Sequence, residues 1–221
     1  MNKRQRDKFQ KDLGSYFKEI HRIYVGGNFR EESFYPSLKA LVEEGSGLLG
    51  NLAGVLVQPK KTEVGIPDFL VRKNGQITGY IEAKSPDTKL DAVEESEQLK
   101  RYLGSLSNLI LTNFLEFRLY RKSNLIDQVE VGRQFTLQRL KYPSVPEKLD
   151  LFFQLLEKFF SFSAPEIKTS SDLSIELAKR TRFLEHILQE ELSGENEEVT
   201  RFYKAFQEEL IDRKSVVRER V

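Results

Sequence analysis

Between residues 53 and 131 the hydrophobic pattern changes from helical spacing to short strand-like runs, and this change constrains the fold more than any other feature. Runs of β-branched and aromatic residues separated by Gly, Asn and charged residues are typical of strands. The predicted strands are AGVLVQPKK (53–61), IPDFLVR (66–72), QITGYIEAK (76–84), NLILTN (108–113), EFRLYR (116–121) and LIDQVEV (125–131). The run at 108–113 has a continuous apolar centre at residues 109–111, as expected of a strand covered on both faces.

Helical patterns lie before and within this region. Apolar residues recur at helical spacing over residues 3–22, 31–44 and 91–106, and the cluster Gly45-Ser46-Gly47 is predicted to end the second of these helices. Helices that alternate with strands predict an α/β fold in which helices cover the faces of a mixed sheet.

The chain after Pro146 carries no strand pattern. Helical runs cover residues 147–162, 172–192 and 196–213, which predicts a C-terminal helical bundle. We therefore predict two domains, the sheet domain over residues 1–145 and a helical connector or bundle over residues 146–221. If part of a larger enzyme is absent, an apolar patch exposed on this bundle would favour a homodimer.

Composition excludes several kinds of site. The chain has no cysteine and two histidines, which excludes disulfides, thiolate zinc sites and multi-histidine sites, so any metal must be held by oxygen ligands. The net charge of +1 gives no general case for nucleic-acid binding. No apolar run reaches the roughly 18 residues of a membrane span and the first residues lack the apolar core of a signal peptide, so we expect a cytoplasmic protein without a membrane partner.

The stretch GIPDFLVRKNGQITGYIEAKSP (65–86) places Asp68, Glu82 and Lys84 in otherwise apolar strands. In one interpretation these side chains face water on an ordinary edge hairpin. In the other they converge on one face, which depends on the turn. An Asn74-Gly75 turn would set Asp68 opposite Ile81 and away from Glu82, whereas a three-residue loop ending at Gly75 would set Asp68 opposite Tyr80 and on the face of Glu82. We favour the three-residue loop.

Two carboxylates that converge repel each other, and a divalent cation relieves the repulsion. Oxygen ligands and open coordination positions suit Mg²⁺, and Mn²⁺ is a possible substitute. Lys84 would lie beside a water and a phosphate, where its ammonium can offset developing negative charge. The stretch therefore predicts a hydrolytic phosphodiesterase centre.

The elements Pro67-Asp68 and Glu82-Ala83-Lys84 resemble the PD-(D/E)XK nuclease superfamily. The resemblance implies a restriction-endonuclease-like sheet in which Asp68, Glu82 and the carbonyl of Ala83 hold the metal while Lys84 assists catalysis. Two further resemblances extend the predicted catalytic set. Gln98 and Tyr102 are similar to the QxxxY element of the RecB-like branch, in which the glutamine reaches the active site; the alternative for the two is an ordinary surface and an ordinary core position. Glu32 is similar to a helix glutamate aimed at the metal, with Glu31 as its rival, and the alternative is a carboxylate stabilised at a helix N-terminus.

The longer run EESEQLKRYLGSLSNLILTNFLEFRLYR resembles the N-terminal nuclease domains of single-chain type IIG and type ISP restriction-modification enzymes. In those enzymes a helical connector leads to an adenine-specific methyltransferase. This chain has no NPPY-type methylation motif, so we expect a fragment, a truncated product or a stand-alone relative, with a methyltransferase module as a partner in cis or in trans.

A nuclease must hold double-stranded DNA, and phosphate contacts by Lys and Arg position a protein on it. The predicted DNA-binding residues are Lys60, Lys61, Lys89, Lys100, Arg101, Tyr102 and Asn113. For each of the charged residues the alternative is a solvated surface charge.

These observations predict a metal-dependent endodeoxyribonuclease of a restriction-modification system, in which water attacks phosphorus directly. A non-catalytic DNA-binding or interaction module built on the nuclease scaffold is the alternative from another class. A RecB-like exonuclease is a third hypothesis.

Overall fold

The computed structural model describes residues 1–58, 67–139, 145–163, 169–193 and 197–218, which belong to two compact units. The first unit comprises Met1–Lys60 and Ile66–Ile167, and the second comprises Lys61–Gly65 and Lys168–Val221. Within the described ranges, no helix combines the length and the apolar character that crossing a membrane requires.

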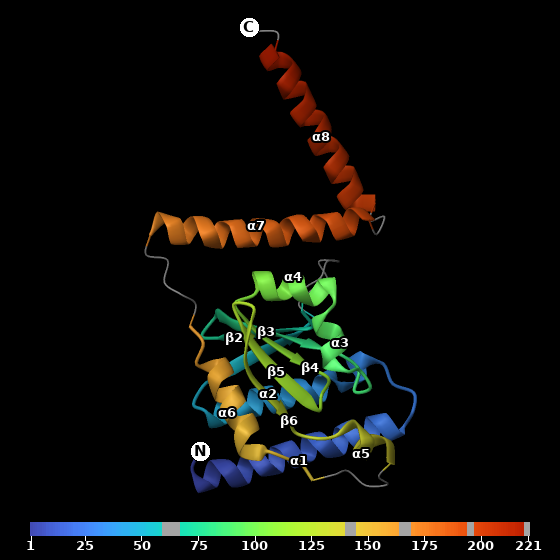
Figure 1. The fold of residues 1–221 in the computed structure, drawn as a ribbon, viewed down its shortest axis with the longest axis vertical. Helices are drawn as coiled ribbons and strands as arrows, with labels where there is room; N and C mark the ends of the chain where they lie inside the picture. The colour runs from blue at the N-terminus through green and yellow to red at the C-terminus, as the bar shows by residue number, and fades with distance from the viewer. Residues whose placement is uncertain (59–66, 140–144, 164–168, 194–196, 219–221) are drawn as a thin grey trace. The chain divides into compact units, whose positions relative to one another are not determined.

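A six-stranded sheet in the order β1-β2-β3-β4-β5-β6 forms the centre of the first unit (Figure 1). Its strands are β1 (Ala53–Val57), β2 (Phe69–Lys73), β3 (Gln76–Ala83), β4 (Asn108–Thr112), β5 (Glu116–Arg121) and β6 (Asn124–Glu130). Neighbouring strands are antiparallel except β3 and β4, which are parallel and are joined by a helical crossover. The predicted α/β fold with a mixed sheet and flanking helices is confirmed.

The large hydrophobic core fills one face of the sheet. It is built by α1 (Lys3–Val25), η1 (Glu31–Phe34), α2 (Tyr35–Leu48) and α6 (Leu149–Phe160), together with alternate residues of the strands. Phenylalanines contribute much of this core, because each aromatic side chain buries a large apolar area. The fully buried ones include Phe9, Phe17, Phe34, Phe69, Phe114, Phe117, Phe152, Phe159 and Phe160.

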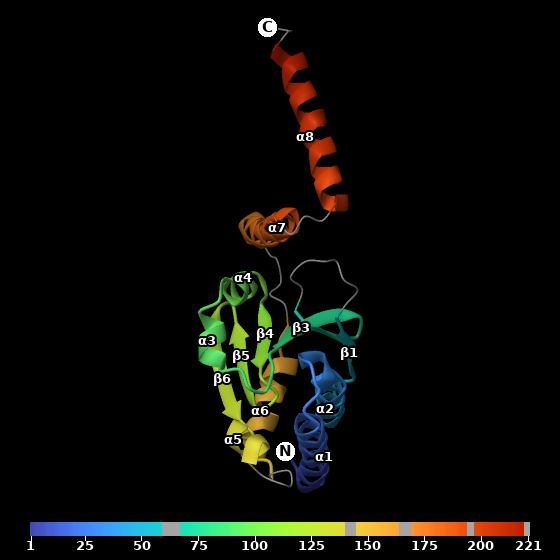
Figure 2. The same ribbon diagram turned by 90° about the vertical axis from the view of Figure 1, so that its right-hand side faces the viewer.

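The crossover between β3 and β4 consists of α3 (Leu90–Glu94) and α4 (Glu97–Ser105), which lie on the face opposite α1 and α2 (Figure 2). One continuous helix was predicted over 91–106. The break occurs at Ser96, whose Oγ accepts the N–H of Leu99 and so begins a new helix as its N-cap. The strand β4 is buried along its whole length, as its apolar sequence predicted.

The predicted end of α2 at Gly45 is wrong, because the helix continues to Leu48. A Cβ at Gly45 would lie 2.9 Å from Cδ1 of Leu156 on α6. The glycine therefore permits close packing of two helices and does not end one of them. A local pattern cannot separate these two uses of glycine.

The helix predicted at 147–162 was assigned to the C-terminal domain, but the structure has α6 in the first unit. The buried side chains of Phe152, Leu155, Leu156 and Phe159 belong to the core under the sheet. The boundary between the units thus falls after Ile167. A short helix, α5 (Gln134–Arg139), was not predicted.

The second unit contains two long helices in its described part, α7 (Ser170–Ser193) and α8 (Glu197–Arg218), in place of the predicted three-helix bundle. The two helices contact each other and line a groove of about 480 Å³. Apolar side chains there are exposed, including Leu184, Phe202 and Phe206. A homodimer through this surface stays a prediction.

Candidate functional site

The β2–β3 hairpin sets the position of the acidic residues. Its turn is Asn74-Gly75, with φ values of 51° and 79°, as in a type I′ turn. Lys73 therefore pairs with Gln76, and the predicted three-residue loop is wrong.

A β-bulge then corrects the register. Arg72 pairs with Ile77 but Val71 pairs with Gly79, so Thr78 is an extra residue in β3. After the bulge Phe69 pairs with Ile81, and the same register continued by one residue sets Asp68 opposite Glu82. Neither predicted pairing of Asp68 is correct, because an inserted residue in mid-strand cannot be read from the turn.

The bulge is clamped by Asn108, which is 1% exposed. Its Nδ2 donates to the carbonyl of Thr78 at 2.9 Å and to that of Phe159 at 3.0 Å, so one amide joins the bulge to the end of α6. A Cβ at Gly79 would lie 2.6 Å from Cε2 of Phe159, so glycine is needed at that point.

Replacing Asn108 by Ala is expected to lower the free energy of unfolding by about 2–4 kcal/mol, because two buried carbonyls lose their donor. Urea denaturation measures this. The matched control is Asn124→Ala, because the amide of Asn124 donates to the carbonyl of Lys122 on the surface. This change should alter the free energy of unfolding by less than about 0.5 kcal/mol. Equal effects of the two changes would contradict the clamp.

The carboxylate of Asp68 is held by two donors from different elements. Its Oδ2 accepts the N–H of Ala83, the last residue of β3, at 2.8 Å. Its Oδ1 accepts the hydroxyl of Tyr35 at 2.6 Å. Each oxygen of an ionised carboxylate can accept a further bond, so Asp68 retains capacity for a cation.

Glu82 is a buried carboxylate whose side chain is 4% exposed. Lys84 contacts it, with 2.5 Å between Nζ and Oε1. Burial, followed by repulsion from Asp68, raises the pKa of Glu82 from 4.5 to about 7, although Lys84 acts in the opposite direction. These contacts define one electrostatic cluster, formed by Asp68, Glu82 and Lys84. When both carboxylates are ionised, the single ammonium of Lys84 offsets only one of the two negative charges.

The helix glutamate that joins this cluster is Glu31, the rival of the predicted Glu32. Glu31 lies in η1, where its Oε1 is 3.1 Å from the hydroxyl of Tyr35, whereas Glu32 is exposed. Burial raises the pKa of Glu31, and Asp68 raises it further while Lys84 lowers it. The sequence offered two adjacent glutamates, and only the turn geometry of η1 separates them.

Gln98 and Tyr102 of α4 lie beside the cluster. Nε2 of Gln98 is 3.2 Å from the hydroxyl of Tyr102, as their spacing of four residues predicts. Burial, with a contribution from Glu82, raises the pKa of Tyr102. Tyr102 is 2% exposed, so its ring is not presented to DNA as predicted.

Asn113 is also structural, because it is 8% exposed and its amide is used within the fold. Its Nδ2 donates to the carbonyl of Thr88, and its Oδ1 accepts the N–H groups of Leu115 and Glu116. It therefore ties the loop after Lys84 to the β4–β5 turn. The predicted DNA contact is not available to this side chain.

The predicted basic contacts differ in their surroundings. Lys89 and Lys100 are exposed, and Nζ of Lys100 lies 3.0 Å from Oε1 of Glu97. Arg101 is half-buried. Lys60 and Lys61 lie outside the described residues.

Two residues that sequence reasoning missed support the cluster. Tyr35 contacts both Glu31 and Asp68, and its position four residues after Glu31 was the available signal. Asp87 anchors the loop that follows Lys84 by accepting the hydroxyl of Tyr24 at 2.7 Å and Nε2 of Gln134 at 3.0 Å.

The donor set can be compared with what a metal ion needs. Over the described residues, no three His, Cys, Asp or Glu side chains gather into a metal-binding group. Two carboxylates do meet here, and Mg²⁺ binds proteins through one or two carboxylates while keeping several waters. Asp68 and Glu82 fit that pattern, with the carbonyl of Ala83 as the remaining predicted ligand.

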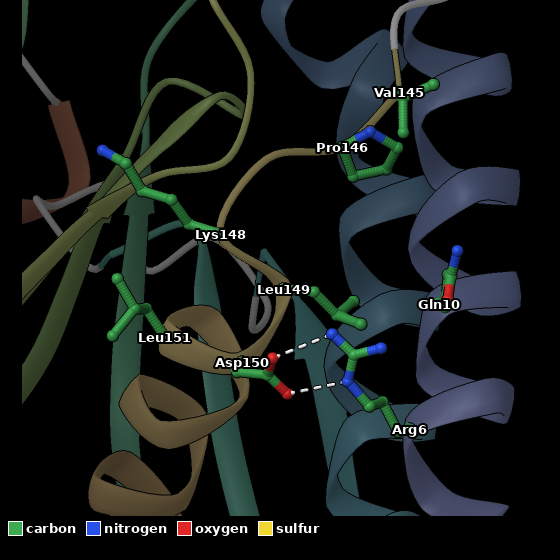
Figure 3. Close-up of a pocket in the computed structure, with 8 residues that line it drawn as sticks. All are labelled: Arg6, Gln10, Val145, Pro146, Lys148, Leu149, Asp150 and Leu151. Carbon is green, nitrogen blue, oxygen red and sulfur yellow. Dashed lines mark hydrogen bonds and ion pairs between the residues drawn. The ribbon is translucent and has the colours of Figure 1, made fainter. Parts of the chain in front are cut away.

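A pocket of about 390 Å³ elsewhere in the first unit contains none of the cluster residues. Arg6 of α1 spans it to Asp150 at the start of α6 through two hydrogen bonds of 3.2 and 3.0 Å (Figure 3). Both side chains are about half exposed, so this ion pair adds little to the stability of the fold.

Comparison with known proteins finds a match among solved structures. No protein-family model and no curated protein matches the sequence. A chain in the cryo-electron-microscopy structure of the DrdV–DNA complex matches with a TM-score of 0.53 and 18% identity. The two chains share a fold. The match covers 71% of this chain and 14% of the DrdV-complex chain, so this chain corresponds to a small part of that protein.

Proposed function

We propose that this chain is a metal-dependent DNA endonuclease domain of a restriction-modification system, of the PD-(D/E)XK kind. The observation that carries the proposal is the meeting of Asp68 and Glu82 at the ends of two neighbouring strands with Lys84 bonded to Glu82. A structural role alone does not account for two such carboxylates, since burying like charges together destabilises a fold.

Asp68 and Glu82, with the carbonyl of Ala83, would hold Mg²⁺ or Mn²⁺. When bound, the cation supplies Lewis-acid stabilisation of the charge on a scissile phosphate. Lys84 has a side chain that is 24% exposed, so its ammonium can orient a water and donate to a phosphate oxygen. Water attacks phosphorus directly, the bond from phosphorus to one sugar oxygen breaks, and that oxygen takes up a proton and leaves as a hydroxyl group, so no covalent enzyme intermediate forms. Gln98 and Glu31 border the reacting groups.

The shared fold with a protein solved in a complex with DNA supports DNA as the substrate. Because the match spans 14% of that chain, we propose that this domain works with further modules, among them a methyltransferase in cis or in trans. Lys89, Lys100 and Arg101 would contact phosphates without reading bases.

The alternative is a non-catalytic DNA-binding or interaction module. One observation favours it. Within the described residues, no three His, Cys, Asp or Glu side chains gather into a metal-binding group. In that case Lys84 serves only to offset the charge of Glu82.

Plasmid cleavage tests the proposal. With Mg²⁺ the protein is expected to nick or linearise closed circular DNA, and EDTA should stop the reaction because the carboxylates alone cannot stabilise the phosphate charge. Cleavage of linear DNA only would indicate an exonuclease. DNA binding without cleavage under Mg²⁺ or Mn²⁺ would favour the non-catalytic module.

A further inference from the structure

The hydroxyl of Tyr35 lies between two carboxylates at the edge of the cluster. It is 2.6 Å from Oδ1 of Asp68 and 3.1 Å from Oε1 of Glu31. Tyr35 is 3% exposed, and its ring centroid lies 4.8 Å from that of Phe69 and 6.5 Å from that of Phe114. Aromatic packing therefore fixes where the hydroxyl points.

One phenol has one hydrogen to donate, and both of its neighbours are acceptors when ionised. The shorter contact assigns that hydrogen to Asp68. A charge-assisted bond of this kind is shorter and stronger than one between neutral groups.

Asp68 is thus oriented from two sides. Ala83 on β3 fixes Oδ2 and Tyr35 on α2 fixes Oδ1, which together set the plane of the carboxylate. Without the hydroxyl, only the N–H of Ala83 would restrain the terminal torsion of Asp68, which is soft for aspartate. A ligand that must be ordered during binding loses affinity relative to one that is already in place.

We propose that Tyr35 is a positioning residue that orients the carboxylate of Asp68 for a divalent cation and so sets the affinity of the site for that cation. The inference rests on the proposed function, because it assumes that Asp68 is a metal ligand. It assigns Tyr35 no contact with substrate or with the reacting atoms.

The test compares Tyr35→Phe with Tyr120→Phe in the full chain. Tyr120 is a matched control because it is also buried, at 5% exposure, and its hydroxyl also donates to a carboxylate, that of Glu94, outside the cluster. Phe keeps the ring contacts in both cases, so both variants should fold. Mn²⁺ is titrated against each protein and followed by electron paramagnetic resonance.

We expect Tyr35→Phe to weaken the Kd for Mn²⁺ by about tenfold, as for other residues that orient a metal ligand. Its Mn²⁺ spectrum should also change, which lost stability alone would not cause, and Tyr120→Phe should match wild type in both. In an Asp68→Asn background Tyr35→Phe should have no further effect on binding.

The outcomes separate the two proposals. If wild type does not bind Mn²⁺, the metal site and this inference both fail. If wild type binds and Tyr35→Phe binds equally well, or if Tyr120→Phe weakens binding as much, the positioning role fails while the metal site stands.

Discussion

Replacing Asp68 by Asn is expected to abolish Mg²⁺-dependent DNA cleavage and to leave the fold intact. The amide oxygen of Asn can still accept the N–H of Ala83, so the strand end keeps its hydrogen bond. The anionic ligand is lost, and the affinity for the cation should fall by at least about 100-fold. Plasmid cleavage under single-turnover conditions measures the activity, and circular dichroism verifies the fold.

Lys84→Met distinguishes metal binding from chemistry. It keeps the aliphatic part of the side chain and removes the ammonium, so we expect metal binding to persist while cleavage falls by about 10²–10³-fold. Asp127→Asn is the matched control for Asp68→Asn, because Asp127 pairs with Lys158 on the other edge of the sheet. Cleavage by Asp68→Asn at the wild-type rate would exclude Asp68 from the reaction.

The second large effect concerns the pH dependence of stability without metal. Glu82 has a pKa raised from 4.5 to about 7 in the fold, so the folded state holds this proton more tightly than the unfolded chain does. The stability that Glu82 contributes is therefore complete below pH 4.5 and is lost as the pH rises through about 7. Each pKa unit corresponds to about 1.4 kcal/mol, which gives a loss of about 3 kcal/mol.

Glu82→Gln isolates this effect from the other titrating groups. Gln resembles the protonated carboxyl, so the variant and wild type should have similar free energies of unfolding near pH 4. Near pH 8 the metal-free variant should be more stable by about 3 kcal/mol. Saturating Mg²⁺ should stabilise wild type at pH 8 and leave the variant unchanged. A stability difference that does not vary with pH would contradict the raised pKa. Urea denaturation over the pH range measures these differences.

The strands and the residues of the cluster were predictable because they follow from local patterns. Short β-branched runs marked all six strands, and Asp68, Glu82 and Lys84 stood out as charges within them. Glycine was less informative. Gly45 resembled a helix end, yet it allows the contact with Leu156, which is distant in sequence.

The remaining features depend on tertiary packing. The bulge at Thr78 is held by Asn108, and α6 is drawn into the first unit by the apolar side chains under the sheet. Tyr102 and Asn113 have the chemistry of DNA contacts, but packing buries both of them. Tyr35 was missed because a tyrosine at helical spacing is typical of a core position. Its ring does pack in the core, but its hydroxyl contacts the carboxylates of Asp68 and Glu31.

The most direct test is a calorimetric titration of Mn²⁺ into the metal-free protein at pH 8 and into Asp68→Asn under the same conditions. We predict a single binding event in wild type that is absent in the variant. No binding to wild type, or equal binding to both proteins, would contradict the claim that Asp68 and Glu82 hold a divalent cation.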